Sequence, residues 1–384
     1  MTVLHVLIPL LGVAFTAFHA AFARWLLNGI PFAPKRAPAS YETPNVTVLV
    51  AARDEAGNLP SLIPALLAQS YPVDRTQIVL VDDRSSDATS ELARELGQGR
   101  VEVIRVDELP SGMGPKKHAL LRGLGVARGE IVVQLDADNV PDPDWLSCMI
   151  QRFQPRTGAV CGLVLHGPPG TGVAKWFHGI WAVEALGWSA VQAAAIGAGK
   201  PISANGGNLA YRRKAFDDVG GFVRHQNVVS GDDDFLIQSI ADSGRWEVIC
   251  PDAPSTVLRT AGPASWRQVW EQRKRWGSKC IRYDLDRVLL LSAIYLSYAY
   301  VLFVGIYGLW AKWALPWVGI VLVAFVVEAW LLVHRLAVRT GSRGLLRWFP
   351  LAAVVQIPLV LAAVWAGTWG RFRWKDQATK AVRP

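Results

Sequence analysis

The stretch EIVVQLDADN (Glu130–Asn139) decides the fold that the sequence predicts. Its first half is a β-branched apolar run typical of a buried strand, and Asp136 and Asp138 stand at its end. Because alternate residues of a strand share one face, we expect the two carboxylates to point the same way. Such a pair suits a divalent cation, Mg²⁺ or Mn²⁺, that also binds phosphate oxygens. The alternative is a loop in which Asp136, Asp138 and Asn139 bind backbone amides.

Strand-like and helix-like segments alternate from residue 45 to about residue 262, which predicts an α/β fold with a mostly parallel sheet. The expected strands are VTVLVAA (46–52), TQIVLVDD (76–83), VEVIRV (101–106) and EIVVQLDAD (130–138). The helix DATSELARELG (87–97) is expected to follow the second strand, with Asp87 as its cap.

Charged residues follow three of the expected strands. They are Arg53 to Glu55, Asp82 with Asp83, and Asp136 with Asp138. Ligands of open α/β sheets bind beyond the carboxyl ends of the strands. These clusters therefore predict a site for a nucleoside diphosphate at that edge.

Hydrophobic residues make up 51% of the 384 residues and concentrate in runs at 3–22, 288–311, 313–333 and 349–370. Each run has about the 20 residues that cross a bilayer. We therefore expect an N-terminal transmembrane helix (1–23), two more (288–333), and a transmembrane or re-entrant helix (349–370). The other expected segments are a linker (24–44), the α/β domain (45–262), an interfacial helix (263–287), a basic loop (334–348) and a basic tail (371–384). A signal peptide cleaved near Ala23 is the alternative for the first run.

Basic residues beside these runs set the expected orientation. Arg24, Lys35 and Arg36 follow the first run, so the positive-inside rule places the α/β domain on the cytoplasmic face of an integral membrane protein. The net charge of +9 is explained by basic residues next to anionic lipid headgroups. A nucleic-acid partner is not expected, because no basic stripe interleaves with aromatic residues between 45 and 262.

Several motifs resemble, in the same order, those of the inverting family-2 glycosyltransferases with a GT-A fold. They are VLVAARDEAGNL (48–59), VDDRSSDAT (81–89), GPKKHALLRG (114–123), LDADN (135–139), SANGGNLAYRRKAF (203–216), SGDDDFL (230–236) and QRKRW (272–276). The resemblance covers residues 46–279. It implies a membrane-bound enzyme that moves a sugar from a nucleoside diphosphate, with a UDP-sugar as first choice, to a hydroxyl of a lipid or other hydrophobic acceptor.

The resemblance also implies roles for the matched residues. Those expected at the nucleotide sugar are Ala52, Arg53, Glu55, Asp83, Lys116, Asp136, Gln272, Arg275 and Trp276. Those expected at the acceptor are Gly206, Gly207, Asn208 and Trp276. Asp138 with Asp136 is expected to bind Mg²⁺ or Mn²⁺, and Asp233 is expected to be the catalytic base, with Asp232 beside it. The alternative for residues 231–234 is a helix N-cap with an acidic first turn.

Other functions remain as alternatives. A small processive polysaccharide synthase also carries a Q-x-x-R-W motif, although the expected helices have few polar residues to line a channel. HGPPGTGVAKW (166–176) begins like a phosphate-binding P-loop but lacks its Lys-Ser/Thr, which leaves an ATPase as a remote alternative. A catalytically silent scaffold is another. Residues 272–276 could instead be a basic membrane flank, and the Trp stripe at 176–188 could be core or line the acceptor entrance.

Overall fold

The computed structural model describes residues 3–30, 43–110, 112–167, 173–223, 228, 230–251, 253–369, 371–374 and 377–380. The chain divides into two compact units. The helical unit comprises Met1–Ile30, Pro169–Ala194 and Gly262–Pro384, and the α/β unit comprises Pro31–Pro168 and Ala195–Ala261.

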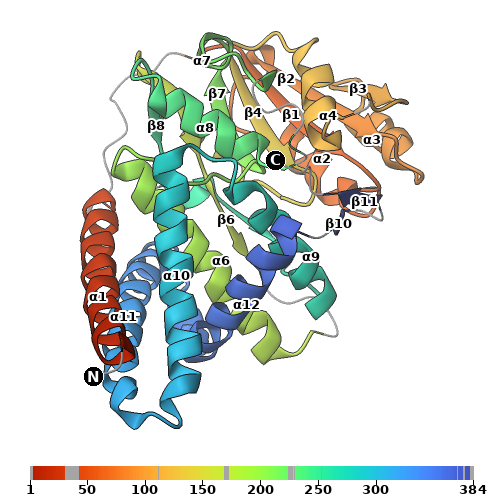
Figure 1. Cartoon of the computed structure of the whole chain (residues 1–384). Coiled ribbons are helices and arrows are strands. Elements are labelled where there is room, and N and C mark those ends of the chain that lie inside the picture. The colour runs from red at the N-terminus through yellow and green to blue at the C-terminus, as the bar shows by residue number, and fades with distance from the viewer. Residues whose placement is uncertain are drawn as a thin grey trace. The chain divides into compact units, whose positions relative to one another are not determined.

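A seven-stranded sheet forms the centre of the α/β unit, in the order β3-β2-β1-β4-β7-β5-β8 (Figure 1). Its strands are β1 (Val46–Ala52), β2 (Thr76–Asp83), β3 (Val101–Val106), β4 (Ile131–Asp136), β5 (Thr157–Cys161), β7 (Asn208–Arg212) and β8 (Glu247–Ile249). Strands β1 to β4 pair in parallel, whereas β7 runs antiparallel between β4 and β5. The predicted mostly parallel sheet is confirmed.

Alternate strand residues build a hydrophobic core on each face of the sheet. Val48 and Val50 of β1 lie in one core and Leu49 in the other. The helices of the first core are α2 (Leu59–Leu67), α3 (Thr89–Gly97) and α5 (Trp145–Ile150), and those of the second are α4 (Pro115–Leu124), α7 (Arg213–Asp218) and α8 (Asp232–Asp242). Because both faces are covered, β1, β2 and β4 are mostly apolar in their middle parts, and this makes these strands recognisable in the sequence.

Two smaller features complete the α/β unit. β6 (Leu163–His166) and β9 (Val257–Thr260) form a separate parallel pair. Two 3₁₀ helices, η1 (Val73–Arg75) and η3 (Pro254–Thr256), precede β2 and β9.

Two local predictions in this unit are wrong. β4 ends at Asp136, so Asp138 lies in the turn that follows and strand alternation does not fix its direction. Helix α3 has Ala88, not Asp87, at its N-cap. The carboxylate of Asp87 still accepts a hydrogen bond from the backbone N–H of Thr89 (3.1 Å), so it binds a first-turn amide from one residue further out.

Long apolar helices dominate the helical unit. They are α1 (Val3–Gly29), α6 (Lys175–Gly197), α10 (Leu285–Gly308), α11 (Leu315–Arg339) and α12 (Phe349–Trp369), together with α9 (Trp266–Cys280), η4 (Lys312–Ala314) and η5 (Arg343–Trp348). Within the described ranges, five helical segments are long and apolar enough to cross a membrane, and α6 is one of them. The helix α1 continues to Gly29, beyond the apolar run that ends at Phe22.

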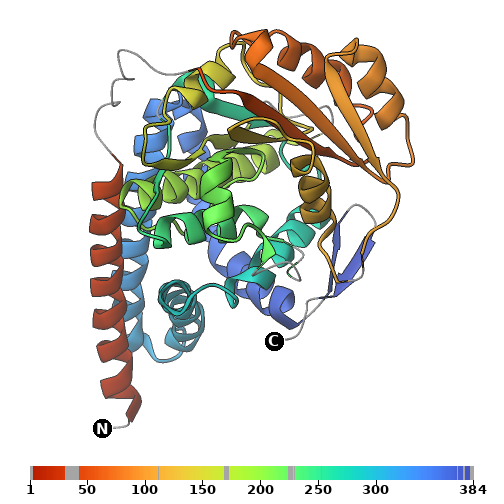
Figure 2. The ribbon, with the colours of Figure 1, turned by 90° about the horizontal axis from the view of Figure 1, so that it is seen from above.

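Helix pairs hold the helical unit together. α1 lies beside α11 (Figures 1 and 2), and α9 packs against α12. Two glycines allow the backbones of α9 and α12 to touch. A Cβ on Gly367 would lie 2.3 Å from the carbonyl oxygen of Lys274, and one on Gly277 would lie 2.9 Å from Cα of Val364. Larger residues at these positions would push α9 away from α12.

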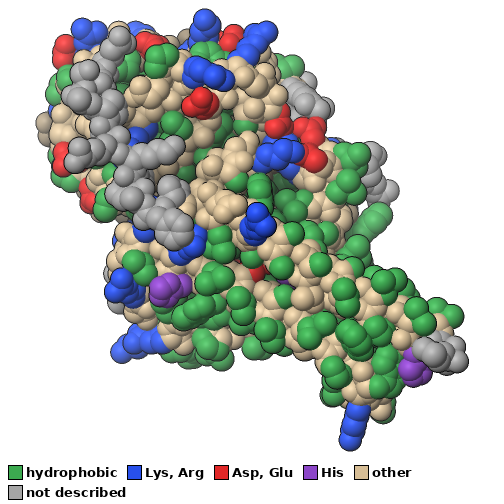
Figure 3. Space-filling model, turned by 90° about the vertical axis from the view of Figure 1, so that its left-hand side faces the viewer, with side chains coloured by type: hydrophobic (Ala, Val, Ile, Leu, Met, Phe, Trp, Pro, Cys, Tyr) green, Lys and Arg blue, Asp and Glu red, His purple; other side chains and the backbone are tan. Residues whose placement is uncertain are grey.

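Hydrophobic side chains gather over the helices of this unit, as Figure 3 shows for one face. Exposed examples are Val3, Leu10 and Val13 on α1, Phe303 on α10, and Val354 and Trp365 on α12. A large exposed apolar surface marks contact with a membrane or with another protein. Together with the lengths of the helices, it indicates membrane association.

A polar cluster joins three of the long helices. His19 of α1 is 2.6 Å from Oε2 of Glu328 in α11 through Nδ1, and 3.0 Å from Oγ of Ser297 in α10 through Nε2. All three side chains are buried. Polar groups that are shielded from water in this way stabilise a specific pairing of helices.

The predicted basic tail contains a short antiparallel pair of strands. β10 (Arg371–Trp374) pairs with β11 (Gln377–Lys380). Two other predictions lie partly outside the described residues. These are the linker, of which residues 31–42 are not described, and the P-loop-like stretch, of which residues 168–172 are not described.

Candidate functional site

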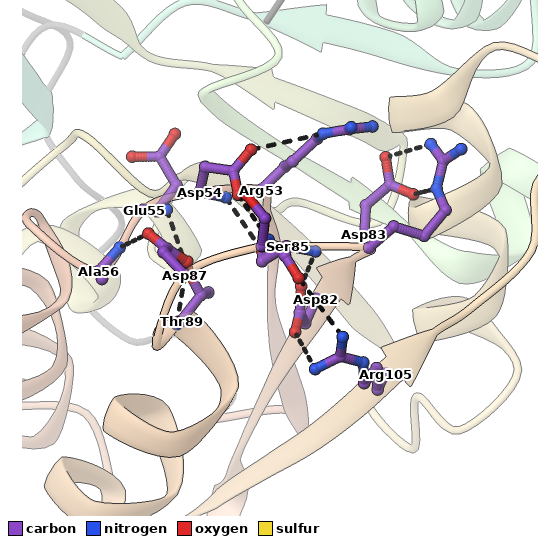
Figure 4. A network of polar contacts seen from close by, with 12 residues as sticks. Arg53, Asp54, Glu55, Ala56, Asp82, Asp83, Ser85, Asp87, Thr89 and Arg105 are labelled. Carbon is purple, nitrogen blue, oxygen red and sulfur yellow. Dashed lines mark hydrogen bonds and ion pairs between the residues drawn. The ribbon is translucent and has the colours of Figure 1, made fainter.

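The loops that follow β1 and β2 are tied together by hydrogen bonds (Figure 4). The backbone N–H of Asp54 donates to Oγ of Ser85 (2.9 Å), and that of Glu55 donates to Oγ1 of Thr89 (2.9 Å). The N–H of Ala56 donates to Asp87 (3.1 Å). Because β1 and β2 are parallel neighbours, both loops leave the same edge of the sheet, as the sequence predicted.

The neighbouring carboxylates of Asp82 and Asp83 have different partners. Asp82 accepts hydrogen bonds from the backbone N–H of Ser85 (2.9 Å) and from the hydroxyl of Ser90. Asp83 accepts both ends of the Arg84 guanidinium, at 2.8 and 3.1 Å. Asp82 therefore fixes the loop, while Asp83, expected at the nucleotide sugar, is paired with Arg84.

The ammonium group of Lys116 lies among carboxylates at this edge. It donates to Oδ1 of Asp136 (2.7 Å) from the first turn of α4. Burial opposes the charge of Lys116, but Asp136, Asp232 and Asp233 outweigh this effect and raise the pKa of its ammonium group. Lys116 is therefore held in its cationic form.

Asp138 lies beside Asp136 but has a different partner. The hydroxyl of Thr260 donates to Oδ2 of Asp138 (2.7 Å). Desolvation, the charge of Asp136 and, to a smaller extent, that of Glu55 raise the pKa of the Asp138 carboxyl above its ordinary value. Excess negative charge therefore surrounds this side chain.

That charge fits a divalent cation. Among the residues that the structure describes, no group of three or more His, Cys, Asp or Glu side chains could hold a metal ion. Two carboxylates are nevertheless a suitable set for Mg²⁺ or Mn²⁺ when phosphate oxygens and water complete the coordination. A cation at this position would offset both the desolvation and the repulsion from Asp136 that raise the pKa of Asp138.

The three consecutive aspartates at the start of α8 differ in exposure. Asp232 and Asp234 are buried, whereas Asp233 is partly exposed. Asp234 accepts from the backbone N–H of Ala204 (2.9 Å), and Asp233 accepts from that of Gly206 (2.9 Å). Burial raises the pKa of the Asp232 carboxyl, Lys116 opposes this rise, and Asp233 adds to it. Asp233 is thus the member of the three that an acceptor could reach.

Glycines 206 and 207 lie directly against these charged groups. A Cβ on Gly206 would come within 3.3 Å of Oδ2 of Asp233 and of Nζ of Lys116. A Cβ on Gly207 would lie 2.5 Å from Oδ2 of Asp136. These contacts bring the predicted residues Lys116, Asp136, Gly206, Gly207 and Asp233 to one place.

Asn208 belongs to the core instead. Its side-chain amide donates to the carbonyl oxygens of Leu163 (3.0 Å) and Thr256 (2.8 Å), and its Oδ1 accepts from Nε1 of Trp145 (3.0 Å). Asn208 is fully buried. Its side chain therefore joins β7 to its neighbours and is not available to an acceptor, contrary to what the resemblance implied.

Ala52 and Arg53 stand at the end of β1. Ala52 is buried, and Nε of Arg53 lies 3.7 Å from Oδ2 of Asp54. Gln272, Arg275 and Trp276 lie on α9 in the helical unit and are half-buried. Oε1 of Gln272 accepts a hydrogen bond from Arg273 (2.8 Å). Arg273 and its partner Glu184 were not singled out from the sequence as a pair. The signal that could have revealed them is a single acidic residue within the apolar helix 175–197.

Known proteins resemble this chain in sequence. Residues 47–220 match the protein family described as Glycosyl transferase family 2. The beta-monoglucosyldiacylglycerol synthase of Trichormus variabilis is 29% identical over 247 residues, which cover 63% of this chain and 50% of that protein. The probable glycosyltransferase YdaM of Bacillus subtilis is 25% identical over 252 residues, which cover 63% of this chain and 57% of that protein. The chain thus spans about half the length of these relatives.

A solved structure resembles it in fold. The mannosyltransferase PcManGT from Pyrobaculum calidifontis, in complex with GDP-Man and Mn²⁺, matches with a TM-score of 0.59 and 24% sequence identity. The match covers 94% of this chain and 99% of that one. At this level of identity the likeness shows a shared fold.

Proposed function

Because residues 47–220 match glycosyl transferase family 2 and the sheet is mostly parallel and GT-A-like, we propose that the chain is a membrane-bound inverting glycosyltransferase. It would move a sugar from a nucleoside diphosphate, a UDP-sugar in the first instance, to a hydroxyl group of a lipid. The lipid acceptor is supported by the relative from Trichormus variabilis, which is named a beta-monoglucosyldiacylglycerol synthase. The catalytic α/β unit would face the cytoplasm, as the basic residues beside the apolar runs indicate.

One observation carries the proposal: a cation and a reachable carboxylate meet at one spot on the sheet edge. Lys116 is 2.7 Å from Asp136, and Gly206 lies against both Lys116 and Asp233. Group transfer from a nucleoside diphosphate needs positive charge for the departing diphosphate and a base for the attacking hydroxyl. This part of the sheet edge offers both.

Each residue has a distinct task in this reaction. Lys116 stabilises negative charge on the diphosphate as the sugar leaves, and Asp233 accepts the proton of the acceptor hydroxyl as it attacks. The small glycines 206 and 207 let the acceptor approach these groups closely. Asp136 and Asp138 would hold Mg²⁺ or Mn²⁺, which when bound supplies further stabilisation of charge on the diphosphate.

The test uses the full chain in lipid nanodiscs with Mn²⁺, a panel of radiolabelled UDP- and GDP-sugars, and a total lipid extract. Label that enters the organic phase as one discrete species supports a lipid glycosyltransferase and identifies its donor. Label in a water-insoluble polymer identifies a processive synthase and overturns the lipid acceptor. No transfer from any donor, with phosphate released from ATP, overturns the glycosyltransferase proposal in favour of an ATPase.

A further inference from the structure

A buried ion pair joins helices α6 and α9 of the helical unit. The guanidinium of Arg273 donates from Nε to Oε1 of Glu184 (2.8 Å) and from Nη2 to Oε2 of the same carboxylate. The two side chains are 4% and 5% exposed. Glu184 is the single acidic residue of α6, which is otherwise apolar apart from Lys175, His178, Ser189 and Gln192. Burying two charges costs desolvation energy, which can exceed the attraction between them. A stabilising effect alone therefore does not explain why this pair is buried.

The same guanidinium contacts two residues of the Q-x-x-R-W motif, Gln272 and Trp276. Its Nη1 donates to Oε1 of Gln272 (2.8 Å). Its Cζ lies 4.1 Å from the ring centroid of Trp276, within the range of a cation–π interaction. Both Gln272 and Trp276 remain half-buried, with part of each side chain accessible.

These contacts fix how the two side chains are presented. Because Oε1 of Gln272 is taken by Arg273, the amide NH₂ of Gln272 is turned away from the guanidinium and can donate to a ligand oxygen. Trp276 has the guanidinium against its ring, and Trp188 of α6 packs edge-on to it at 5.9 Å between centroids. One face of the indole is therefore fixed by protein contacts.

We infer that Arg273 and Glu184 are positioning residues for the transfer reaction. Glu184 holds the guanidinium of Arg273 with both oxygens, and Arg273 in turn sets the amide of Gln272 and the ring of Trp276 for contact with the donor or the acceptor sugar. The inference rests on the proposed function, because it assumes that Gln272 and Trp276 bind substrate. A purely structural role, in which the pair only fastens α6 to α9, is the competing explanation.

The decisive variant is the double substitution Glu184→Gln with Arg273→Met. Removing both charges leaves no unpaired ion in the interior, and such replacements are often tolerated by the fold. If the pair only fastens α6 to α9, the folded double variant transfers sugar at the wild-type rate, whatever its unfolding temperature. If the pair positions Gln272 and Trp276, the double variant keeps its unfolding temperature but loses about tenfold or more in kcat, because small misplacements at a reacting centre are costly.

Single substitutions and a matched control complete the test. Arg273→Lys keeps the charge but loses the planar fork, so it should lower kcat more than it changes KM for the nucleotide sugar. Glu271→Gln breaks an ion pair with Lys274 on the same helix and leaves the Gln272 contact intact, so it should leave both constants unchanged. Wild-type kcat in the folded double variant, or an equal loss in Glu271→Gln, overturns the inference while the proposed function stands. A wild-type chain that neither binds nor transfers any nucleotide sugar overturns both.

Discussion

The Nζ atom of Lys116 lies 2.7 Å from Oδ1 of Asp136, at the carboxyl end of strand β4. The contact makes Lys116 the cation of an otherwise acidic cluster, to which Asp232 and Asp233 also contribute. In the proposed reaction this ammonium group exchanges a carboxylate for the diphosphate of the donor.

Replacing Lys116 with Gln should lower kcat/KM by about 10²-fold, because a cation that stabilises the departing diphosphate is lost. Lys116→Arg keeps the charge, so its kcat/KM should fall much less. Steady-state kinetics with the donor found in the nanodisc assay measure both. Equal activity of Lys116→Gln and the wild type would show that the diphosphate binds elsewhere.

Asp233→Asn should reduce kcat by about 10²- to 10⁴-fold, the usual contribution of a general base. Binding of the nucleoside diphosphate, measured by titration calorimetry, should change little because the amide keeps the size of the carboxylate. The matched control is Asp217→Asn, an exposed aspartate paired with Arg213 on α7, which should be neutral. If Asp232→Asn loses turnover while Asp233→Asn keeps it, the catalytic base is the buried Asp232 and not Asp233.

Chelation of divalent cations with EDTA should abolish transfer, and added Mn²⁺ or Mg²⁺ should restore it. Asp138→Asn should raise the metal concentration needed for half-maximal activity at least tenfold, because half of the proposed carboxylate pair is lost. Transfer that is unaffected by EDTA would leave charge stabilisation to Lys116 alone.

Gly207→Ala should lower kcat/KM by about tenfold or more. The added Cβ would lie 2.5 Å from Oδ2 of Asp136 and 2.9 Å from Nδ2 of Asn139, so the acidic loop must move. Gly319→Ala is the control, since a Cβ there meets nothing within 4 Å and it lies in helix α11. Wild-type kinetics in both the Gly207→Ala and the Gly319→Ala variant would count against the proposed site.

His118 should make the stability of the protein sensitive to mild acid. Burial lowers the pKa of its imidazole, Asp83 opposes this effect, and Arg122 and Arg84 reinforce it. With a folded pKa below the unfolded value, the stabilising contribution is present above about pH 6.5 and is lost as the pH falls through the folded pKa.

His118→Gln removes this titration. The variant should therefore gain thermal stability relative to the wild type, by roughly 1–3 °C, when the pH is lowered from 7.5 to 5.5. Thermal unfolding of both proteins in the same detergent measures the difference. Parallel pH profiles would show that His118 titrates in the folded protein as it does in the unfolded chain.

The central sheet was predictable because its strands are buried on both faces. Residues 48–52 and 78–81 are uninterrupted apolar runs, and the polar residues that follow them lie at the edge of the sheet where the ligand site was expected. The positions of β5 and β8 were not predicted, because these strands are short and their order depends on an antiparallel pairing with β7 that no local pattern encodes.

The candidate site was predictable in part for the same reason. Asp136 stands out at the end of an apolar strand, whereas Lys116 and Asp233 were selected because their motifs resemble those of the family-2 glycosyltransferases. Asn208 could not be told from a binding residue, since only tertiary contacts show that Trp145, Leu163 and Thr256 use its whole amide. Arg273 was hidden within a basic run, and its burial depends on Glu184, which is 89 positions away along the chain.

The polar contacts of His19 impose an order on the biogenesis of the helical unit. Its two partners follow it by 278 and 309 positions, so at a synthesis rate of roughly 5–20 residues per second α1 waits on the order of a quarter of a minute to a minute for them. During that interval the imidazole is without the hydroxyl and carboxylate that later satisfy it. Helix α1 is thus synthesised well before both helices that complete its polar contacts, and a nascent chain interrupted before α11 would present quality-control proteases with an unsatisfied polar side chain inside an apolar segment.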